Sequence, residues 1–156
     1  MLEVKAPGNW EHYDPACTVF LSGSIDMGDA PDWQAIISDG LSDIDKLILL
    51  NPRRDDWDSS WVQSFEDARF VEQVEWELNA LDKADYCVHY FAPGGTAPIS
   101  LLELGLRLYL YPKRSIVCAP EGFWRKGNVE ITSRYYGATY VQDIQSVVEI
   151  LKSKLV

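Results

Sequence analysis

Short apolar runs alternate along the chain with longer segments in which apolar residues recur every three or four positions. Short runs of this kind, bounded by turn residues, predict buried strands. The predicted strands cover residues 18–21, 46–50, 85–91, 114–118 and 139–141. The longer segments predict helices that begin near Pro31 and Pro98, a helix over residues 70–81 and a last helix over residues 144–155.

Strands that alternate with helices predict an α/β fold, because parallel neighbours in a sheet need crossover connections. We expect a flavodoxin-like, Rossmann-like three-layer sandwich with helices on both faces of a five-stranded parallel sheet in the order 2-1-3-4-5. A length of 156 residues suits a single domain over residues 1–156.

Three loops of this predicted sheet converge on one edge. Ligands of open α/β sheets bind beyond the carboxyl ends of the strands, where the winding reverses direction. In the expected order, the loops after the first and third strands meet there, and the loop after the second lies close by. The first loop supplies the candidate substrate-binding residues Ser22, Gly23, Ser24, Ile25 and Asp26. Gly23 lets a ligand approach the backbone and the serines offer hydroxyls, although such turns are also common for structural reasons alone.

Glu103 is the candidate reactive residue of the chain. It follows the glycine-containing loop at residues 92–96 and stands among aliphatic residues near the start of the helix that Pro98 begins. The positive end of a helix favours an ionised carboxylate, and an ionised, partly desolvated carboxylate can act as a nucleophile. A structural interpretation is also open, because Ser100 and Glu103 have the spacing of a capping box.

The loop after the second predicted strand places arginines, aspartates and a tryptophan directly beyond it. Asn51, Arg53, Arg54 and Trp57 are candidate substrate-binding residues, since guanidinium groups bind carboxylate, phosphate or carbonyl acceptors and an indole offers a stacking face. An arginine–aspartate network that only holds the loop is an equally good interpretation.

In the predicted helix over residues 70–81, two residues of interest, Trp76 and Glu77, lie outside the apolar stripe. Trp76 points nearly opposite to Val71, Val74, Leu78 and Leu81, so we expect it to be exposed. A large exposed aromatic residue indicates an interface, which predicts a homo-oligomer. Glu77 lies at the flank, where it could reach a ligand at the sheet edge or simply be solvated.

Composition narrows the classes of function. A formal net charge of −10 argues against nucleic acid or an anionic membrane as the main partner. The three cysteines are far apart and indicate reduced core thiols, and with two histidines and no His/Cys grouping we expect no metal site. The first residues have no signal-peptide pattern and no segment could span a bilayer, so a cytoplasmic protein is the expectation.

Several common motifs are missing from the sequence. It has no G-x-G-x-x-G or G-x-x-x-x-G-K-[ST] pattern and no Ser/His/Asp or Cys/His arrangement at motif level. We expect His89, inside a strand, to be a core histidine with satisfied hydrogen bonds. Gly127-Asn128-Val129 is typical of a turn.

A set of motifs in order along the chain resembles the nucleoside 2-deoxyribosyltransferase family, in particular its deoxyribosyltransferase-like branch. The resemblance covers roughly residues 18–141. The motifs are Val19-Phe20-Leu21-Ser22-Gly23-Ser24-Ile25, Asn51-Pro52-Arg53-Arg54, Glu75-Trp76-Glu77-Leu78, Asp85 and Ser100-Leu101-Leu102-Glu103-Leu104-Gly105. This resemblance implies a flavodoxin-like fold, cleavage of the N-glycosidic bond of a 2-deoxynucleoside, nucleoside and free-base substrates, and no metal or organic cofactor.

By the same resemblance, Glu103 matches the nucleophile that takes the sugar, and Glu77 the position that holds or protonates the base. Two positions depart from the family's pattern: Phe20 stands where many members have tyrosine, and Ala97 where many have aspartate. Sugar recognition would then involve Ser100, Ser24 or Asn128 of a neighbouring subunit. A deoxynucleotide hydrolase, with Arg53 and Arg54 on a phosphate, and a catalytically silent nucleotide-binding module remain alternatives.

Overall fold

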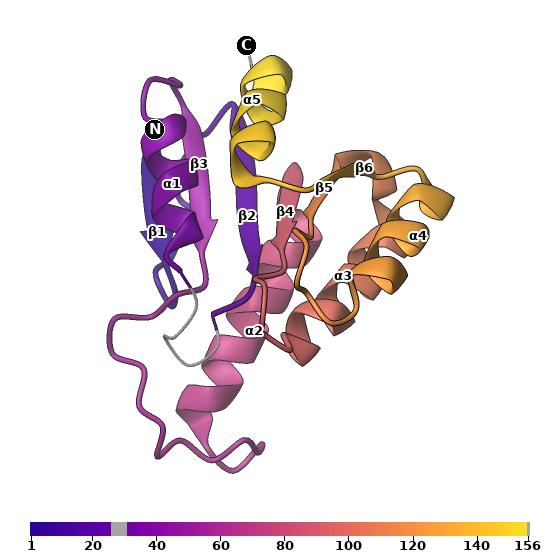
Figure 1. Cartoon of the computed structure of the whole chain (residues 1–156). Coiled ribbons are helices and arrows are strands. Elements are labelled where there is room, and N and C mark those ends of the chain that lie inside the picture. The colour runs from indigo at the N-terminus through magenta and orange to yellow at the C-terminus, as the bar shows by residue number, and fades with distance from the viewer. Residues whose placement is uncertain (26–30, 156) are drawn as a thin grey trace.

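The computed structural model describes residues 1–25 and 31–155, which include a parallel sheet of six strands in the order β1-β3-β2-β4-β5-β6 (Figure 1). All five neighbouring pairs are parallel. The strands are β1 (Leu2–Lys5), β2 (Cys17–Gly23), β3 (Leu47–Asn51), β4 (Tyr86–Tyr90), β5 (Ser115–Cys118) and β6 (Thr139–Val141). The α/β class with a doubly wound sheet is therefore confirmed.

The prediction of five strands is wrong by one, because β1 pairs with the outer edge of β3. The other five strands follow the expected order within this longer sheet. β1 escaped prediction because it has only four residues and two of them are charged, as befits an edge strand with exposed sides. The Asn51 side chain ties it to β3 by donating a hydrogen bond to Glu3 Oε1 over 2.6 Å.

Helices cover both faces of the sheet, which makes a three-layer arrangement (Figure 1). α1 (Trp33–Gly40) and α5 (Ile144–Leu155) contact each other on one face. The other face carries α2 (Ala68–Lys83), α3 (Pro98–Leu110) and α4 (Lys126–Tyr136). A short 3₁₀ turn, η2 (Pro112–Arg114), precedes β5.

Gly127, Asn128 and Val129 lie in helix α4, so the interpretation of these residues as a turn is wrong. Only Val129 and Ser133 of α4 are buried, so the helix has too few apolar residues for a clear periodic signal. Gly137 ends it in the left-handed conformation typical of a helix C-terminus.

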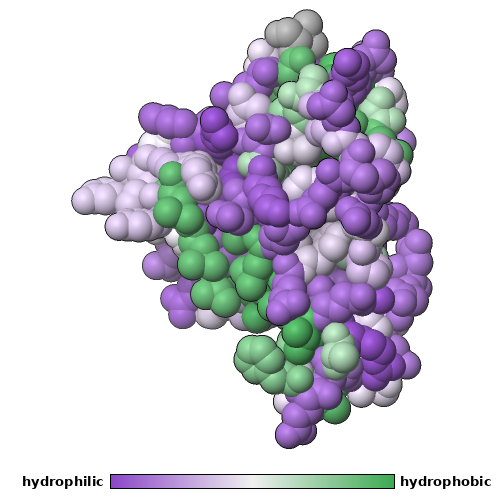
Figure 2. Space-filling model, turned by 180° about the vertical axis from the view of Figure 1, so that it is seen from behind, coloured by the Kyte–Doolittle hydropathy of each residue, from purple (hydrophilic) through white to green (hydrophobic). Residues whose placement is uncertain are grey.

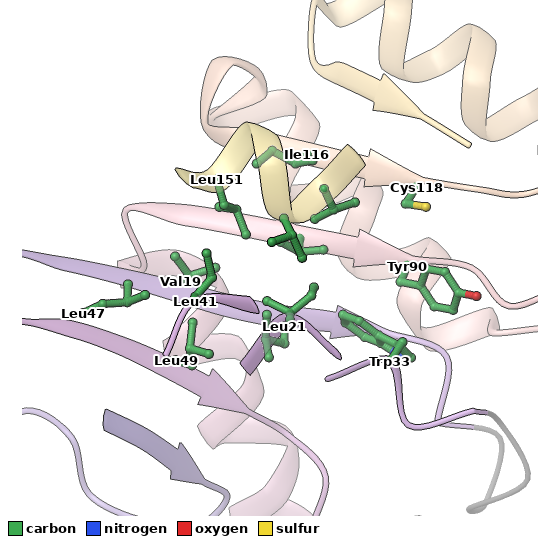
Figure 3. Packing of buried hydrophobic residues seen from close by; sticks show 14 of the residues in the cluster. Val19, Leu21, Trp33, Leu41, Leu47, Leu49, Tyr90, Ile116, Cys118 and Leu151 are labelled. Carbon is green, nitrogen blue, oxygen red and sulfur yellow. The ribbon is translucent and has the colours of Figure 1, made fainter. Parts of the chain in front are cut away.

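The core beneath α1 and α5 is formed by alternate residues of the central strands and by the inner sides of the two helices (Figure 3). Trp33 at the start of α1 is 1% exposed and lies against the Tyr90 ring, with 5.1 Å between ring centroids. Its indole N–H donates to the Ser24 backbone carbonyl over 3.0 Å. Trp33 therefore fixes α1 against the turn that follows β2.

The core on the opposite face contradicts the expectation that Trp76 is exposed. Trp76 is 9% exposed, packs its ring edge-on against Phe20 and donates to the Gly8 carbonyl over 2.8 Å. The N-terminal segment that carries β1 and Trp10 covers this side of α2, which a helical wheel of α2 alone does not include. The buried residues of α2 are Gln73, Trp76, Ala80 and Leu81, whereas Leu78 is 44% exposed.

Two smaller expectations concern cysteines and membrane spans. The cysteines are all free, and Cys87 and Cys118 are buried, in agreement with reduced core thiols. Within residues 1–25 and 31–155, no helix has both the length and the apolar character needed to cross a membrane.

Candidate functional site

Glu103 lies on the inner side of α3, facing the carboxyl end of β2. Its carboxylate is buried, with 6% of the residue exposed, and accepts a hydrogen bond from the Ser22 hydroxyl over 2.6 Å. Ala97, in the left-handed conformation, is the residue that precedes α3, and no side chain caps the helix. The capping-box interpretation of Ser100 and Glu103 is therefore wrong.

The turn after β2 is shaped by close contact with β4. A Cβ atom added to Gly23 would lie 2.4 Å from the Tyr90 carbonyl oxygen, so only glycine allows the two backbones to approach here. One residue on, the Ser24 hydroxyl accepts a hydrogen bond from the Ala92 amide over 2.9 Å. These contacts fix the position of Ser22 relative to α3.

Glu77 approaches the same place from α2. Gln73, one turn earlier on that helix, donates to Glu77 Oε1 over 2.6 Å and to the Pro52 carbonyl over 2.9 Å. Both N–H groups of the Gln73 amide are thus occupied, and they connect Glu77 to the loop after β3. Sequence reasoning missed Gln73, although a glutamine four residues before a candidate acid was the available signal.

Burial sets the protonation of the two carboxyl groups. Burial raises the pKa of Glu103 to about 7, and the hydrogen bond from Ser22 opposes this shift. Burial, together with the negative charge of Glu103, raises the pKa of Glu77 to about 8, and the hydrogen bond from Gln73 opposes this rise. The helix start therefore does not keep Glu103 strongly acidic. Because Ser22 favours the ionised form of Glu103, the shared proton resides mainly on Glu77 near neutral pH.

His89 lies on β4 in register with Ser22 and is fully buried. Neither ring nitrogen has a hydrogen-bond partner among the described residues, which corrects the expectation of a satisfied core histidine. Burial, together with the nearby Arg107 charge, lowers the pKa of His89 to about 3. His89 is a neutral imidazole at physiological pH, so it adds no positive charge behind Glu103.

The loop after β3 begins with Asn51, whose side-chain oxygen and nitrogen both form hydrogen bonds within the protein, and continues with Arg53, whose side chain is only partly used. Asn51 is buried, and besides binding Glu3 it accepts a hydrogen bond from the Arg53 amide over 3.0 Å, a local turn that starts the loop. The Arg53 guanidinium donates to Gln34 Oε1 over 3.3 Å and lies 3.9 Å from Asp32. Its Nε has no acceptor among the described residues, which leaves one donor of Arg53 unused.

Arg54 serves the loop rather than an open site. Its guanidinium makes a two-bond pair with Asp56, over 2.8 and 2.9 Å, and a third hydrogen bond to Glu72 over 3.1 Å. The same group lies 4.7 Å from the centre of the Trp61 ring. The structural interpretation of the Arg/Asp motif therefore holds for Arg54.

The remaining candidate residues are placed less centrally. Trp57 is 42% exposed and packs on Trp61, with 5.0 Å between ring centroids. Ser100 is buried in the first turn of α3, and Ile25 is half-buried at the end of the turn after β2. Asn128 is exposed on α4. The prediction for Asp26 concerns a position outside the described residues.

The arrangement can supply one ionised and one protonated carboxyl group in a site that is largely shielded from water. A charged carboxylate in such a site stabilises a developing positive charge strongly or bonds to the carbon that carries it. A protonated partner can donate its proton to a leaving group. Among residues 1–25 and 31–155, no group of three or more His, Cys, Asp or Glu side chains is arranged to hold a metal ion.

The fold and the carboxylate pair define an α/β protein with a candidate acid–nucleophile site at the carboxyl edge of a parallel sheet. A sequence model described as nucleoside 2-deoxyribosyltransferase like matches residues 16–123, which is more than half of the chain. The protein belongs to this nucleoside 2-deoxyribosyltransferase-like family. Membership supports a function in nucleoside processing by glycosyl transfer or a related reaction, with nucleosides as substrates.

A solved structure supports the fold. The crystal structure of a conserved protein from Enterococcus faecalis V583 is similar to this chain, with a TM-score of 0.60 and 11% sequence identity. The similarity covers 89% of this chain and 99% of that protein. Comparison with curated protein sequences gave no match.

Proposed function

We propose that the protein exchanges the base of 2′-deoxynucleosides through a covalent deoxyribosyl intermediate on Glu103. The observation that carries the proposal is the pair of buried Glu103 and half-buried Glu77, in which Ser22 holds the first and Gln73 the second. Such a pair divides the roles of nucleophile and acid between two chemically identical groups.

In the first half-reaction, the bond between the sugar C1′ and the base nitrogen breaks and its electron pair leaves with the base. A carboxylate oxygen of Glu103 forms the new bond to C1′. Positive charge accumulates on the sugar in the transition state, so the negative charge of Glu103 stabilises it before the bond is complete. Glu77 donates its proton to the departing base, which leaves as a neutral molecule.

The second half-reaction reverses these roles. A nitrogen of another free base attacks C1′ from the vacated side, and the bond between C1′ and Glu103 breaks. Glu77, now ionised, takes the proton that the incoming base loses. Two displacements at the same carbon restore the original configuration, and each group returns to its starting protonation state.

Gln73 supports this cycle as a positioning residue. Its amide donates to Glu77 in either protonation state of that carboxyl group, because one oxygen of a protonated carboxyl still accepts. The second N–H is held by the Pro52 carbonyl, so the amide has little freedom to turn. Glu77 is thereby kept on the inner side of α2 throughout the cycle.

Incubation of the purified protein with a deoxynucleoside and a different free base, followed by chromatography, tests the proposal. A new deoxynucleoside is the expected product. Free deoxyribose without exchange would instead indicate a hydrolase, and cleavage of 5′-monophosphates alone would indicate a nucleotide enzyme in which Arg53 meets the phosphate. Binding without turnover would indicate a silent nucleotide-binding module.

Matched variants connect any activity to the site. Glu103→Ala and Glu103→Gln should each lower exchange by at least ~10³-fold, as expected when a nucleophile is removed. Glu75→Gln is the control, since Glu75 lies on the same helix as Glu77 but is exposed. Full exchange activity in both Glu103 variants would contradict the assignment.

A further inference from the structure

The side-chain carbonyl of Gln73 is a buried hydrogen-bond acceptor that no described residue uses. Gln73 is 5% exposed and belongs to α2, on the face of the molecule whose surface Figure 2 shows as a mixture of hydrophilic and hydrophobic side chains. Its amide nitrogen donates to Glu77 and to the Pro52 carbonyl. Its oxygen, Oε1, accepts no hydrogen bond from the residues that the structure describes. A buried acceptor left in this state destabilises the fold, so packing alone does not explain Gln73.

The orientation of the Gln73 amide is fixed by Pro52. A peptide carbonyl can only accept, so the amide atom that lies 2.9 Å from the Pro52 oxygen is the nitrogen. Turning the amide over would bring Oε1 against that carbonyl, where two acceptors would face each other without a proton between them. Gln73 therefore cannot adapt to either kind of ligand, as a freely turning amide can. Its unused group is always an acceptor.

Glu77 supplies the complementary group beside this acceptor. Its Oε1 accepts from Gln73 over 2.6 Å, so the proton of the neutral carboxyl group resides on Oε2. Because the two side chains are joined by this hydrogen bond, the Gln73 carbonyl and the Glu77 carboxyl are close neighbours. Together they present one acceptor and one donor. A ligand that uses both must carry an N–H group beside an atom that accepts.

We propose that Gln73 is a specificity-determining residue that selects bases with an exocyclic amino group beside an unprotonated ring nitrogen. Adenine and cytosine carry this pair on an edge away from the sugar. The amino group donates to Gln73 Oε1, and the ring nitrogen accepts from Glu77. Hypoxanthine and uracil have a carbonyl oxygen in place of the amino group, and that oxygen would face Gln73 Oε1. The inference rests on the proposed function, because it names the substrates of the same site.

The same contacts serve the proposed first half-reaction. The proton of Glu77 passes to the ring nitrogen that it already faces, and the electron pair of the broken bond to C1′ stays with the base. The base therefore leaves as a neutral tautomer. Throughout this step the amino group keeps its hydrogen bond to Gln73, so the ring nitrogen stays aligned with Glu77.

Discrimination follows from the burial of the Gln73 oxygen. An amino group gives this oxygen the donor that it lacks, whereas a carbonyl group leaves it unpaired and adds repulsion. We expect kcat/KM for base release to be at least ~10-fold higher for deoxyadenosine than for deoxyinosine. The same preference is expected for deoxycytidine over deoxyuridine.

Rates of base release from these four deoxynucleosides test the inference. Gln73→Leu should lower the rate for all four, because Glu77 loses the hydrogen bond that holds it, and should also bring the ratio within each pair close to one. A merely structural role of Gln73 would lower the rates and leave the ratios unchanged. Gln145→Leu is the matched control, because Gln145 is exposed on α5, and it should keep the wild-type rates and ratios. Wild-type ratios near one, or ratios unchanged in Gln73→Leu, would overturn the proposal.

Calorimetric binding of free adenine and free hypoxanthine separates this inference from the proposed function. Tighter binding of adenine, with the difference lost in Gln73→Leu, would support the inference even if no deoxynucleoside were cleaved and the proposed function failed. Exchange that proceeds equally well with all four bases would support the proposed function and overturn the inference. A protein that binds neither base and cleaves no deoxynucleoside would contradict both.

Discussion

The guanidinium of Arg107 donates a hydrogen bond to the backbone carbonyl of Leu81 and so joins α3 to α2 inside the protein. Arg107 lies one turn beyond Glu103 on α3, and Leu81 lies one turn beyond Glu77 on α2. A second bond, to the Ala84 carbonyl over 2.8 Å, reaches the end of α2. A buried cation at a helix C-terminus is favourably placed, so Arg107 sets the spacing of the helices that carry the two carboxyl groups.

The first prediction concerns this connection. Arg107→Met should lower the free energy of unfolding by about 3 kcal/mol, because it leaves buried carbonyl groups without donors. In the folded fraction, kcat should fall more than KM rises, since Glu77 and Glu103 lose their relative position. Denaturant unfolding and steady-state kinetics check both effects. Arg107→Lys should recover part of the stability, and an Arg107→Met variant with wild-type stability would contradict this role.

The second prediction concerns the pH dependence of the rate. Glu103 must be ionised and Glu77 protonated, so kcat/KM should rise through the pKa of Glu103, about 7, and fall through that of Glu77, about 8. Glu77→Gln cannot lose a proton, so its profile should lack the fall at alkaline pH while the rate is lower throughout. Glu75→Gln should keep the wild-type bell shape. An alkaline limb that persists in Glu77→Gln would assign it to another group.

The third prediction separates the two effects of Ser22 on Glu103. The Ser22 hydroxyl donates to the carboxylate, so Ser22→Ala should raise the pKa of Glu103 further and move the acidic limb upward by about one to two pH units. The acidic limb then meets the alkaline limb set by Glu77, so the pH range of activity should narrow and the maximal rate should fall. A loss of rate without any displacement of the acidic limb would mean that Ser22 contacts the substrate instead.

The fourth prediction concerns stability. The folded-state pKa of each carboxyl group lies above its ordinary value, so the folded protein binds these protons more tightly than the unfolded chain. The contribution to stability is complete below about pH 4.5, is lost as pH rises through the folded pKa values and is constant above them. Glu77→Gln should therefore be more stable than the wild type at pH 9, by roughly 1 kcal/mol or more.

Chemical denaturation at several pH values measures this difference. Glu149→Gln is the control because Glu149 is exposed on α5. A constant difference between Glu77→Gln and the wild type from pH 4.5 to 9 would show that burial does not perturb Glu77. Functional sites commonly lower the stability of the folded protein in this way, because they hold charged groups away from water.

The sequence predicted those parts of the structure in which local pattern and packing agree. The apolar runs of β2 to β5 are buried on both faces, so their hydropathy identified them directly. The alternation of strands and helices then placed Ser22 and Glu103 at one edge, and the structure joins them by a hydrogen bond. Topology, rather than a local motif, made that pair predictable.

The wrong predictions concern residues whose surroundings are formed by segments far away in the sequence. Trp76 is buried because β1 and the residues after it cover α2, and no helical wheel contains that information. Arg54 has three hydrogen bonds to acidic side chains that depend on how the long loop folds back on α2. The pKa of Glu103 is raised because burial outweighs the effect of the helix start, and the degree of burial follows from tertiary packing.

The central claim is that Glu103 bonds covalently to the sugar. Mass spectrometry of the protein after rapid acid quenching, with a deoxynucleoside present and no acceptor base, tests it most directly. We predict an added mass of one deoxyribosyl group, located on Glu103 by peptide mapping, absent from Glu103→Gln and removed when an acceptor base is added. Turnover without any adduct on Glu103, or an adduct on another residue, would contradict the account.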